Sequence, residues 1–518
     1  MNKNYFIPVL LGSTLLMEGC QVEVNVPPNI IFLLSDDQRD NTFGAMGHPF
    51  VKTPNVDKLI KSGVWFSNTY IAEPVCSPSR VSLLTGMHER VHGVGFSSSY
   101  QLTEEQWAKT YPAILKGNGY YTGFVGKFGV EYYTFRGNAN EKFDYWYGHD
   151  GWTNFFPKES NSSSCKPYHE AENDIITPIM SEAVHHFLDS VPAGQPFCLS
   201  VSLNVPHGSQ TTSMYTGYDG WKEMSRPANE NPDLKGHPVY DTLFRNMDLN
   251  IPGSVATNPY EHIPREVLHQ DSGRSLLYAY DYNKSTVREH HVRYFQTITG
   301  IDILIGELMN KLDEKGMSDN TVIIFASDHG LLMGEYGMGG KALLYDLTSK
   351  IPCFIYDPRL PEELKGIKIE KLVSSLDIPV TILDYAGIDA PPEMNGYSLI
   401  PLMDGSKVTW RSELFLESLF TLRDNPFCEG IRVGDWKYIR MFDGVNPYNE
   451  SHLEFSNRSP DFEQLFHLKD DPGEKNNLIE EYQQSDFLDS LRVKVARHSA
   501  SMNRARDDYK ESHSVKLK

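Results

Sequence analysis

Cysteine is scarce in this sequence, and the few cysteines are far apart. The 518 residues contain six, with no CxxC pair among Cys20, Cys76, Cys165, Cys198, Cys353 and Cys428. Zinc knuckles and thioredoxin-type redox sites depend on such close pairs, so the sequence supports neither kind of site. In an exported protein four of these cysteines could form disulfides, but their spacing does not say which ones pair.

Long hydrophobic runs and an excess of basic residues are also absent. No segment after the N-terminus is apolar over the roughly 20 residues needed to cross a bilayer. Against 68 Asp and Glu residues there are 48 Lys and Arg residues, for a net charge of −20. This charge repels nucleic acid, so we expect no nucleic-acid partner, and an anionic substrate would need local cations.

The N-terminus, MNKNYFIPVLLGSTLLMEGC, predicts an export signal over residues 1–20. Lys3 precedes an apolar stretch that is too short to span a membrane. Its end resembles a bacterial lipoprotein cleavage site in which Cys20 becomes the lipidated first residue, although Glu18 is a poor fit to the usual small residue there. An ordinary signal peptide cleaved nearby is the alternative. We therefore expect an exported protein, in the periplasm or at the cell surface, with Cys20 as the candidate lipid anchor.

Two continuous apolar runs end in carboxylates, NIIFLLSDD (29–37) and TVIIFASDHG (321–330). Runs rich in β-branched and aromatic residues favour central strands of a parallel sheet that is covered on both faces. Further strands are predicted in YTGFVG (121–126) and FCLSVSLNVPH (197–207), and a long helix over 294–316. Alternating strands and helices predict a doubly wound α/β sheet, in which ligands bind beyond the carboxyl ends of the strands.

The pattern changes after NGYSLIPLMDG (395–405). The runs SELFLES, GIRVGDWKYIRM and FEQLFHL predict a small antiparallel sheet, which a terminal helix follows. We therefore expect a catalytic domain over 27–405 and a C-terminal antiparallel-sheet subdomain over 406–518. Between about 208 and 290 the periodicity weakens, and we expect long loops that contribute to substrate recognition.

Cys76 lies in EPVCSPSRVSLLTG (73–86), a segment that predicts a helix start. Pro78 is tolerated in a first helical turn, and Gly86 can end the helix. Cys76 would then lie at the helix N-terminus, where free N–H groups and the helix dipole stabilise negative charge. A lone cysteine is ordinarily a small buried hydrophobe, so only its neighbours indicate chemistry.

Those neighbours carry a family resemblance. Cys76, Pro78, Arg80 and the following LLTG resemble the signature of type I sulfatases, in the alkaline-phosphatase-like superfamily. The blocks NIIFLLSDDQ, GKFG, NVPH, SDHGLLMGEYG, GGKALLYD and LFHLKDDPGEKNNL also resemble the family's blocks, in the family's order. The resemblance implies a large, mostly parallel sheet sandwiched by helices, with a smaller C-terminal α+β domain. It also implies that a maturation enzyme oxidises Cys76 to formylglycine (3-oxoalanine), whose hydrate attacks sulfur.

A metal site is implied at the ends of the two runs that finish in aspartate. By resemblance the ligands would be Asp36, Asp37, Asp328, His329 and the residue made from Cys76. Three carboxylates favour a hard cation such as calcium, while a histidine ligand keeps manganese or another divalent ion open. Alone, the SDD segment could equally be a solvated turn, and the second run is what favours a metal.

Arg80, Lys127, His207 and Lys341 resemble the family's remaining catalytic residues. Arg80 would orient the formylglycine, and the other three would bind sulfate and stabilise charge on its oxygens. His207 or Lys341 could also protonate the leaving oxygen. A lysine is ordinarily a solvated surface charge, so these roles depend on the fold bringing the cations together.

One position departs from the family pattern. The family commonly has Lys-Trp-His where this sequence has Lys127, Phe128 and Gly129, so the usual base is missing from its place. His149, in DYWYGHDGW, could substitute for it or bind substrate, although a surface histidine satisfied by solvent is the simpler interpretation. The aromatic and polar residues of this segment could stack on and bond to sugar rings.

These features predict a sulfuric ester hydrolase that removes sulfate from a sulfated glycan, because export suits the breakdown of extracellular polymers. A phosphate monoester or diester hydrolase of the same superfamily is one alternative, but two-zinc phosphatases need more His and Asp ligands than align here. A catalytically inactive lipoprotein that binds sulfated glycan is the other, because the base expected at Gly129 is missing.

Overall fold

An eight-stranded mixed sheet forms the centre of the computed structural model, which describes residues 27–98, 100–130, 138–214, 237–269, 277–422 and 425–513. The strand order is β11-β2-β10-β7-β1-β6-β4-β5. The strands β7, β1, β6, β4 and β5 run parallel, whereas β10 is antiparallel to both of its neighbours. Their bounds are β1 (Asn29–Ser35), β2 (Val64–Phe66), β4 (Tyr121–Lys127), β5 (Tyr145–His149), β6 (Phe197–Ser202), β7 (Thr321–Ser327), β10 (Cys353–Tyr356) and β11 (Ile367–Ile369).

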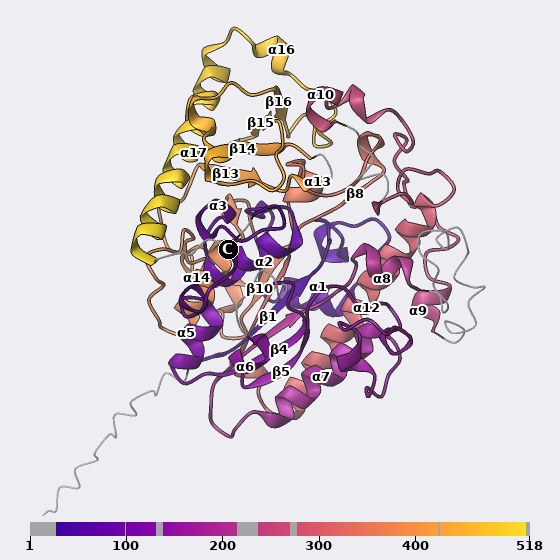
Figure 1. Ribbon diagram of the computed structural model, residues 1–518. Coiled ribbons are helices and arrows are strands. Elements are labelled where there is room, and N and C mark those ends of the chain that lie inside the picture. The colour runs from indigo at the N-terminus through magenta and orange to yellow at the C-terminus, as the bar shows by residue number, and fades with distance from the viewer. Residues whose placement is uncertain are drawn as a thin grey trace, which may run out of the picture.

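Both faces of this sheet are covered by helices, as a doubly wound fold requires (Figure 1). Alternate residues of β1 enter different cores: Ile31 and Leu33 pack on one face, and Ile30 and Phe32 on the other. The first core includes α1 (Pro54–Lys61), α7 (Ile176–Ser190) and α12 (Val287–Glu314). The second includes α2 (Cys76–Thr85), α5 (Tyr111–Gly117) and α14 (Asp377–Tyr385). The predicted fold class is therefore confirmed.

A separate antiparallel sheet follows in the C-terminal part of the chain. It consists of β13 (Glu413–Ser418), β14 (Phe427–Val433), β15 (Trp436–Phe442) and β16 (Phe462–His467), paired in that order. One face packs on the long helix α17 (Asp486–His513), and the other contacts Leu343 and Leu344 of the main domain. The predicted sheet and terminal helix are present, while the domain boundary at 405 stays a prediction.

The segment 197–207 is not one strand, contrary to our expectation. β6 ends at Ser202, and the chain then crosses the end of β1, where the N–H of Leu203 donates to Leu34 at 2.7 Å. Pro206 lacks the N–H that a central strand needs, so the ladder cannot continue. The crossing places His207 beyond the carboxyl end of the sheet.

The cysteines of the described ranges form no disulfides. Cys76, Cys165, Cys198, Cys353 and Cys428 are all buried and free, so these five do not form the disulfides that the sequence left open. The predicted signal and Cys20 lie outside the described residues. Within the described ranges, no helix is both long enough and apolar enough to cross a membrane.

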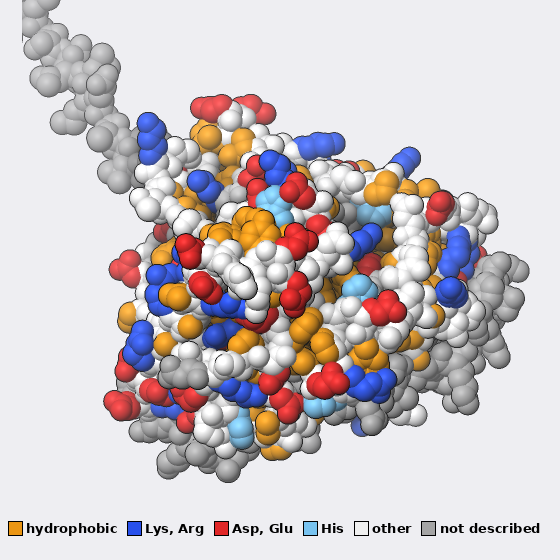
Figure 2. Space-filling view, turned by 90° about the horizontal axis from the view of Figure 1, so that it is seen from above, with side chains coloured by type: hydrophobic (Ala, Val, Ile, Leu, Met, Phe, Trp, Pro, Cys, Tyr) orange, Lys and Arg blue, Asp and Glu red, His pale blue; other side chains and the backbone are white. Residues whose placement is uncertain are grey.

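The segment 208–290 contains little regular structure where it is described. Short helices occur at α8 (Gly208–Thr212), α9 (Pro238–Asp241) and α10 (Arg265–Leu268), and residues 215–236 and 270–276 lie outside the described part. Its role in substrate recognition stays a prediction. On the face shown in Figure 2, acidic and basic side chains are intermixed, without a broad patch of one sign.

Candidate active site

Two aspartates follow β1 and a third follows β7, and all three are buried. Because β1 and β7 pair in parallel with Ser35 opposite Ser327, Asp36 and Asp328 leave the sheet at the same level. Asp37 has a left-handed backbone (φ 68°), and its N–H donates to Oδ1 of Asp328 at 3.2 Å. Buried carboxylates this close together need cations, since burying an unpaired charge is costly.

Helix α2 places Cys76 beside these carboxylates. The helix begins at Cys76 and is ended by Gly86 in the left-handed conformation (φ 68°), as predicted. The hydroxyl of Ser79 donates to the backbone carbonyl of Asp328 at 2.7 Å, which docks the first turn of α2 against the end of β7. The Cys76 side chain therefore lies at a helix N-terminus that favours negative charge.

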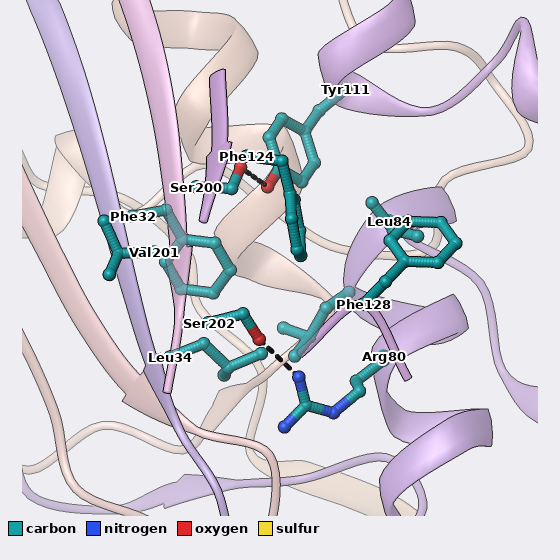
Figure 3. Close-up of a pocket in the computed structure, with 11 residues that line it drawn as sticks. Phe32, Leu34, Arg80, Leu84, Tyr111, Phe124, Phe128, Ser200, Val201 and Ser202 are labelled. Carbon is teal, nitrogen blue, oxygen red and sulfur yellow. Dashed lines mark hydrogen bonds between the residues drawn. The ribbon is translucent and has the colours of Figure 1, made fainter. Parts of the chain in front are cut away.

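Arg80 lies one turn further along α2 and is held by several hydrogen bonds. Its Nε and Nη2 donate to Oδ2 of Asp328 at 3.0 and 2.8 Å, and its Nη1 donates to the carbonyl of Lys127 at 2.9 Å. Nη1 also donates to the hydroxyl of Ser202, drawn dashed in Figure 3. The small cavity in Figure 3 has mostly apolar walls beside this guanidinium, so it offers little to an anionic ligand.

Two lysines bring further positive charge to the carboxylates. Lys127 ends β4, and its Nζ lies 2.5 Å from Oδ2 of Asp36. Lys341 follows the hairpin of β8 (Leu332–Met333) and β9 (Gly339–Gly340). Its Nζ lies 2.8 Å from Oδ1 of Asp37 and 3.3 Å from Sγ of Cys76. Both lysines are thus buried cations rather than solvated surface charges.

Two histidines complete the cluster. Nδ1 of His207 accepts the N–H of Ser209 at 3.1 Å, so a neutral ring carries its proton on Nε2, which lies 3.8 Å from Oδ2 of Asp37. His329 follows the third aspartate directly. Its Nδ1 lies 3.2 Å from Oδ1 of Asp37, and its Nε2 lies 3.3 Å from Nζ of Lys341.

The cations keep the first two carboxylates ionised. Burial alone would raise the pKa of Asp36, but Lys127 and Arg80 outweigh it and hold the pKa well below its ordinary value. Burial likewise acts to raise the pKa of Asp37, and Lys341 reverses the direction, so this pKa is also lowered. Ionised oxygens are what a divalent cation requires of its ligands.

The pKa values of the Cys76 thiol and of His207 are also shifted in this site. Burial would raise the pKa of the Cys76 thiol, yet Lys127 and Lys341 together lower it. Burial lowers the pKa of His207 to about 4, so its imidazole is neutral at pH 7. The pocket therefore stabilises negative charge at position 76 and offers a neutral N–H donor at His207.

The donor atoms also fit a divalent cation. Oδ1 of Asp36 and Oδ2 of Asp37 are buried and have no hydrogen-bond partner within the described residues. Buried unpaired carboxylate oxygens are rare in folded proteins unless a ligand satisfies them. The ligand atoms lie within 4.8 Å of one another in two overlapping sets: Asp36, Cys76, Asp328 and His329, and Asp36, Asp37 and His207. The fold therefore brings all five predicted metal ligands together.

Comparison with known proteins identifies the family. The sequence profile described as Sulfatase matches residues 28–388, and the profile described as N-sulphoglucosamine sulphohydrolase, C-terminal, matches residues 334–501. The chain belongs to the sulfatase family. A formylglycine and a divalent metal ion follow from that membership, and the clustered donors are consistent with both.

Curated sulfatases are similar over most of their length. The N-acetylglucosamine-6-O-sulfatase of Bacteroides thetaiotaomicron is 25% identical over 502 residues, which cover 89% of this chain and 84% of that protein. The N-acetylglucosamine-6-sulfatase of Homo sapiens is 27% identical over 496 residues, which cover 87% and 81%.

Solved structures share the fold. A protein in complex with its substrate D-glucosamine-2-N,6-O-disulfate has a TM-score of 0.64 and 21% identity, over 94% of this chain and 100% of that one. The phosphonate monoester hydrolase of Agrobacterium radiobacter has a TM-score of 0.62 and 18% identity, over 92% of this chain and 96% of that one. At these identities the likeness shows the fold alone.

Gly129 occupies the position where sulfatases commonly have histidine, and the local packing favours glycine there. Its backbone is left-handed (φ 70°), and its carbonyl accepts the Ser77 hydroxyl at 2.6 Å. A Cβ at this position would lie 2.5 Å from Cδ of Arg80, too close for any side chain without movement. A histidine could therefore stand at position 129 only if Arg80 moved.

His149 is buried, so our interpretation of it as a surface histidine is wrong. β5 pairs with β4 so that His149 lies opposite Lys127, and only 3% of it is exposed. Its Nδ1 bonds to the hydroxyl of Tyr168, in the short helix η3 (Lys166–Tyr168) that covers the end of β5. Its Nε2 has no hydrogen-bond partner among the described residues. Burial, then Lys127, lowers its pKa to about 3, so the ring is neutral.

Two hydroxyl groups that support this sulfatase site were not predicted. The Tyr294 hydroxyl donates to the carbonyl of Asp37 at 3.0 Å and accepts the N–H of Arg39 at 2.8 Å, which holds the left-handed turn. Ser202 holds Arg80. Both lie inside regular elements whose patterns indicate only a helix and a strand, so the sequence carried no signal for them.

Tyr278 is a third side chain that was missed. A Cβ on Gly340 would lie 2.6 Å from its ring, so Tyr278 packs on the backbone just before Lys341. It lies in the aromatic segment LLYAYDY (276–282), within the stretch of weak periodicity. That clustering of tyrosines could have marked the segment as a lining of the site.

Proposed function

We propose that this protein hydrolyses sulfate esters of carbohydrates, using a formylglycine made from Cys76 by a maturation enzyme. The observation that carries the proposal is the position of Cys76 in a sulfatase chain: its Sγ lies 3.3 Å from Nζ of Lys341 and belongs to a cluster of buried carboxylates. The names of relatives that act on N-acetylglucosamine sulfate, and of one active on ulvan, support a glycan substrate.

The cations would bind the sulfate group before the reaction. Lys127 and Lys341 pair with Asp36 and Asp37 in this structure. With a divalent cation bound, Asp36 and Asp37 would have another counter-charge, so the lysines could turn from the carboxylates to the oxygens of the sulfate ester, which is a monoanion. Converging cations of this kind stabilise the charge that develops on those oxygens.

The hydrated aldehyde of formylglycine would supply one hydroxyl to attack sulfur and displace the alcohol, and a second whose deprotonation would expel sulfate and restore the aldehyde. Around it, Arg80 fixes Asp328 through two hydrogen bonds and so holds the floor of the site. His207 presents an Nε2–H donor to the ester, because its Nδ1 already accepts a backbone N–H. The protonated Lys341 can donate a proton to the leaving alcohol oxygen.

The metal ion in this proposal is calcium, held by Asp36, Asp37, Asp328, His329 and the residue at position 76. Three carboxylates favour a hard cation, which would polarise the sulfate oxygens as a Lewis acid. Removal of the metal with a chelator, followed by addition of Ca²⁺, Mn²⁺ or Mg²⁺ in separate reactions, tests its identity. Recovery of sulfate release with Mn²⁺ and not with Ca²⁺ would overturn calcium.

His149 is included as a substrate-site residue. Its Nε2, which has no hydrogen-bond partner in the described part of the chain, is buried beside Lys127, where it could bind a sulfate oxygen or serve as the base that Gly129 cannot provide. The protein is further proposed to be exported and anchored through Cys20, a residue outside the described part of the chain.

Sulfate release measured by ion chromatography tests the main proposal. The protein would be co-expressed with a formylglycine-generating enzyme and incubated with carrageenan, ulvan, fucoidan and glycosaminoglycan oligosaccharides, with Cys76→Ala as control. Release that disappears in Cys76→Ala supports the proposal. No release from protein with formylglycine confirmed by mass spectrometry contradicts it and favours a binding lipoprotein. Phosphate release from matched phosphate esters would favour the phosphohydrolase instead.

A further inference from the structure

The aromatic residues around β5 divide into two kinds in the structure. Trp146 stacks on Phe124 with ring centroids 5.1 Å apart, and Tyr147 packs edge-to-face on Tyr168 at 5.3 Å. These two rings are partly buried and pack against the cores on the two faces of the sheet. Trp152, three residues beyond the strand, is instead 61% exposed. So large an apolar surface left in water is unfavourable, and a ligand that covers it would gain binding free energy.

The backbone around Trp152 is tied to the elements that carry the active site. His149, at the end of β5, lies opposite Lys127 in the paired strands, and three residues span at most about 10 Å. On the other side, Nε2 of Gln210 donates to the hydroxyl and the carbonyl of Thr153. Gln210 belongs to α8, the helix that His207 caps.

A third tie fixes the residue itself. The hydroxyl of Ser164 donates to the carbonyl of Trp152, and Gly151 turns the chain with a left-handed backbone (φ 75°). The indole is therefore carried on an anchored loop that follows β5, the strand paired with the one that presents Lys127, and that is tied to the helix beginning after His207. An aromatic ring held in this way loses little conformational entropy when a ligand covers it.

We propose that Trp152 is a stacking platform for a pyranose ring of the substrate, at the rim of the sulfate pocket. The flat, exposed indole suits the apolar C–H face of a sugar, while the buried cations bind the sulfate on the same or the adjoining residue. Trp152 would then determine specificity, because it selects sulfate esters that carry a sugar ring. This inference rests on the proposed glycan sulfatase function.

Kinetics of Trp152→Ala and Trp152→Phe, in protein matured with formylglycine, test the platform. For sulfated oligosaccharides we expect Trp152→Ala to raise KM about 5- to 10-fold with kcat within about two-fold, and Trp152→Phe to restore most of the loss. For a small alkyl sulfate without a ring, both variants should match the wild type. Tyr397→Ala, which removes another aromatic side chain that is 56% exposed, is the control. It should change KM and kcat for neither substrate.

Binding provides a second measurement that needs no turnover. In the Cys76→Ala background, sulfated oligosaccharides should change the intrinsic tryptophan fluorescence, and Trp152→Phe should remove that change. If the wild type releases sulfate but Trp152→Ala leaves KM unchanged, the platform is wrong and the sulfatase function stands. If no sulfate is released but the fluorescence change depends on Trp152, the platform stands and the hydrolase proposal fails. Absence of both effects overturns the platform.

Discussion

The protein buries two clusters of charged side chains that differ in how their charge is balanced. The active-site cluster, beyond the carboxyl ends of the main sheet, consists of Asp36, Asp37, Asp328, Arg80, Lys127 and Lys341. The interface cluster lies where α2 and α3 (Glu89–His92) meet the antiparallel sheet, and consists of Glu73, Glu89, Arg90, Glu417, Glu429 and Arg440. In the active-site cluster three cations face three carboxylates. In the interface cluster two arginines face four carboxylates.

The interface cluster resolves its excess of carboxylates by holding protons. Arg90 pairs with Glu417 at 3.0 Å and with Glu429 at 2.6 Å. Among the described residues, Glu73 and Glu89 form no salt bridge with an arginine, and burial raises the pKa of both, to about 8 for Glu89. Glu73 accepts the Ser418 hydroxyl, and Glu89 accepts a tyrosine hydroxyl. Burial therefore favours the protonated form of both carboxyl groups, and Glu89 holds its proton at neutral pH.

The comparison distinguishes a cluster that can bind ligands from a cluster that stabilises a contact between two sheets. In the active-site cluster, cations lower the pKa of Asp36 and Asp37, and an oxygen of each has no hydrogen-bond partner among the described residues. That arrangement is open to a metal ion and an anion. In the interface cluster, protons and hydrogen bonds satisfy the excess charge, which suits a permanent contact between the two sheets.

Removing the modified cysteine should have the largest effect. Cys76→Ala should lower sulfate release by at least about 10³-fold, because no other residue supplies the nucleophile. The melting temperature should change little, since Cys76 contributes a small side chain. Activity that survives in Cys76→Ala would show that the active-site cluster does not work through this residue.

Removing one cation of the active-site cluster should come next. Lys341→Ala should lower kcat/KM by about 10²- to 10³-fold while the circular dichroism spectrum stays that of the wild type. The matched control is Lys350→Ala, which removes a nearby lysine that pairs with Asp40 at 2.9 Å. Equal losses in both variants would mean that Lys341 acts through general stability, not through the substrate.

The interface cluster should respond in stability instead of catalysis. Arg90→Ala leaves Glu417 buried without its arginine partner and Glu429 with Arg440 alone, and should lower the free energy of unfolding by about 3–5 kcal/mol. Arg497→Ala, which breaks an exposed pair with Glu413, should stay within about 1 kcal/mol. Urea denaturation of both variants and of the wild type measures these free energies of unfolding. A small loss in Arg90→Ala would remove the distinction between the two clusters.

Per unit of pH, the smallest expected effect is a pH dependence of stability. Between its ordinary pKa of 4.5 and its raised value of about 8, Glu89 binds a proton in the folded chain that it releases on unfolding. The free energy of unfolding therefore falls as pH rises through this window, by at most about 1.4 kcal/mol per unit. Glu89→Gln should be less affected, so its stability relative to the wild type should rise from about pH 5 to about pH 8.

Denaturation of both proteins across this range measures the difference. The exposed Glu105→Gln serves as control and should follow the wild type. A constant difference between Glu89→Gln and the wild type would show that Glu89 is ionised in the folded protein throughout.

Some of this organisation could be predicted from local sequence and some could not. The apolar runs before Asp36 and Asp328 predict central strands, because such runs are buried on both faces of a sheet. The structure confirms both strands. The helix between Cys76 and Gly86 was also predictable from its proline and glycine. The burial of His149 was not, because its cover comes from Tyr168, beyond the next loop.

The sequence by itself determined which residue types are present and the local structure around them: strands that end in aspartate, and a cysteine at a helix start. Only the tertiary structure decided which charges meet. Lys341 and Asp37 are 304 residues apart, and Lys127 and Asp36 are 91 apart, yet each pair forms a buried contact. Strand order and register bring them together, and these depend on packing of the whole sheet. For the same reason, only the folded chain distinguishes the carboxylates that are open to ligands from those that are protonated and closed.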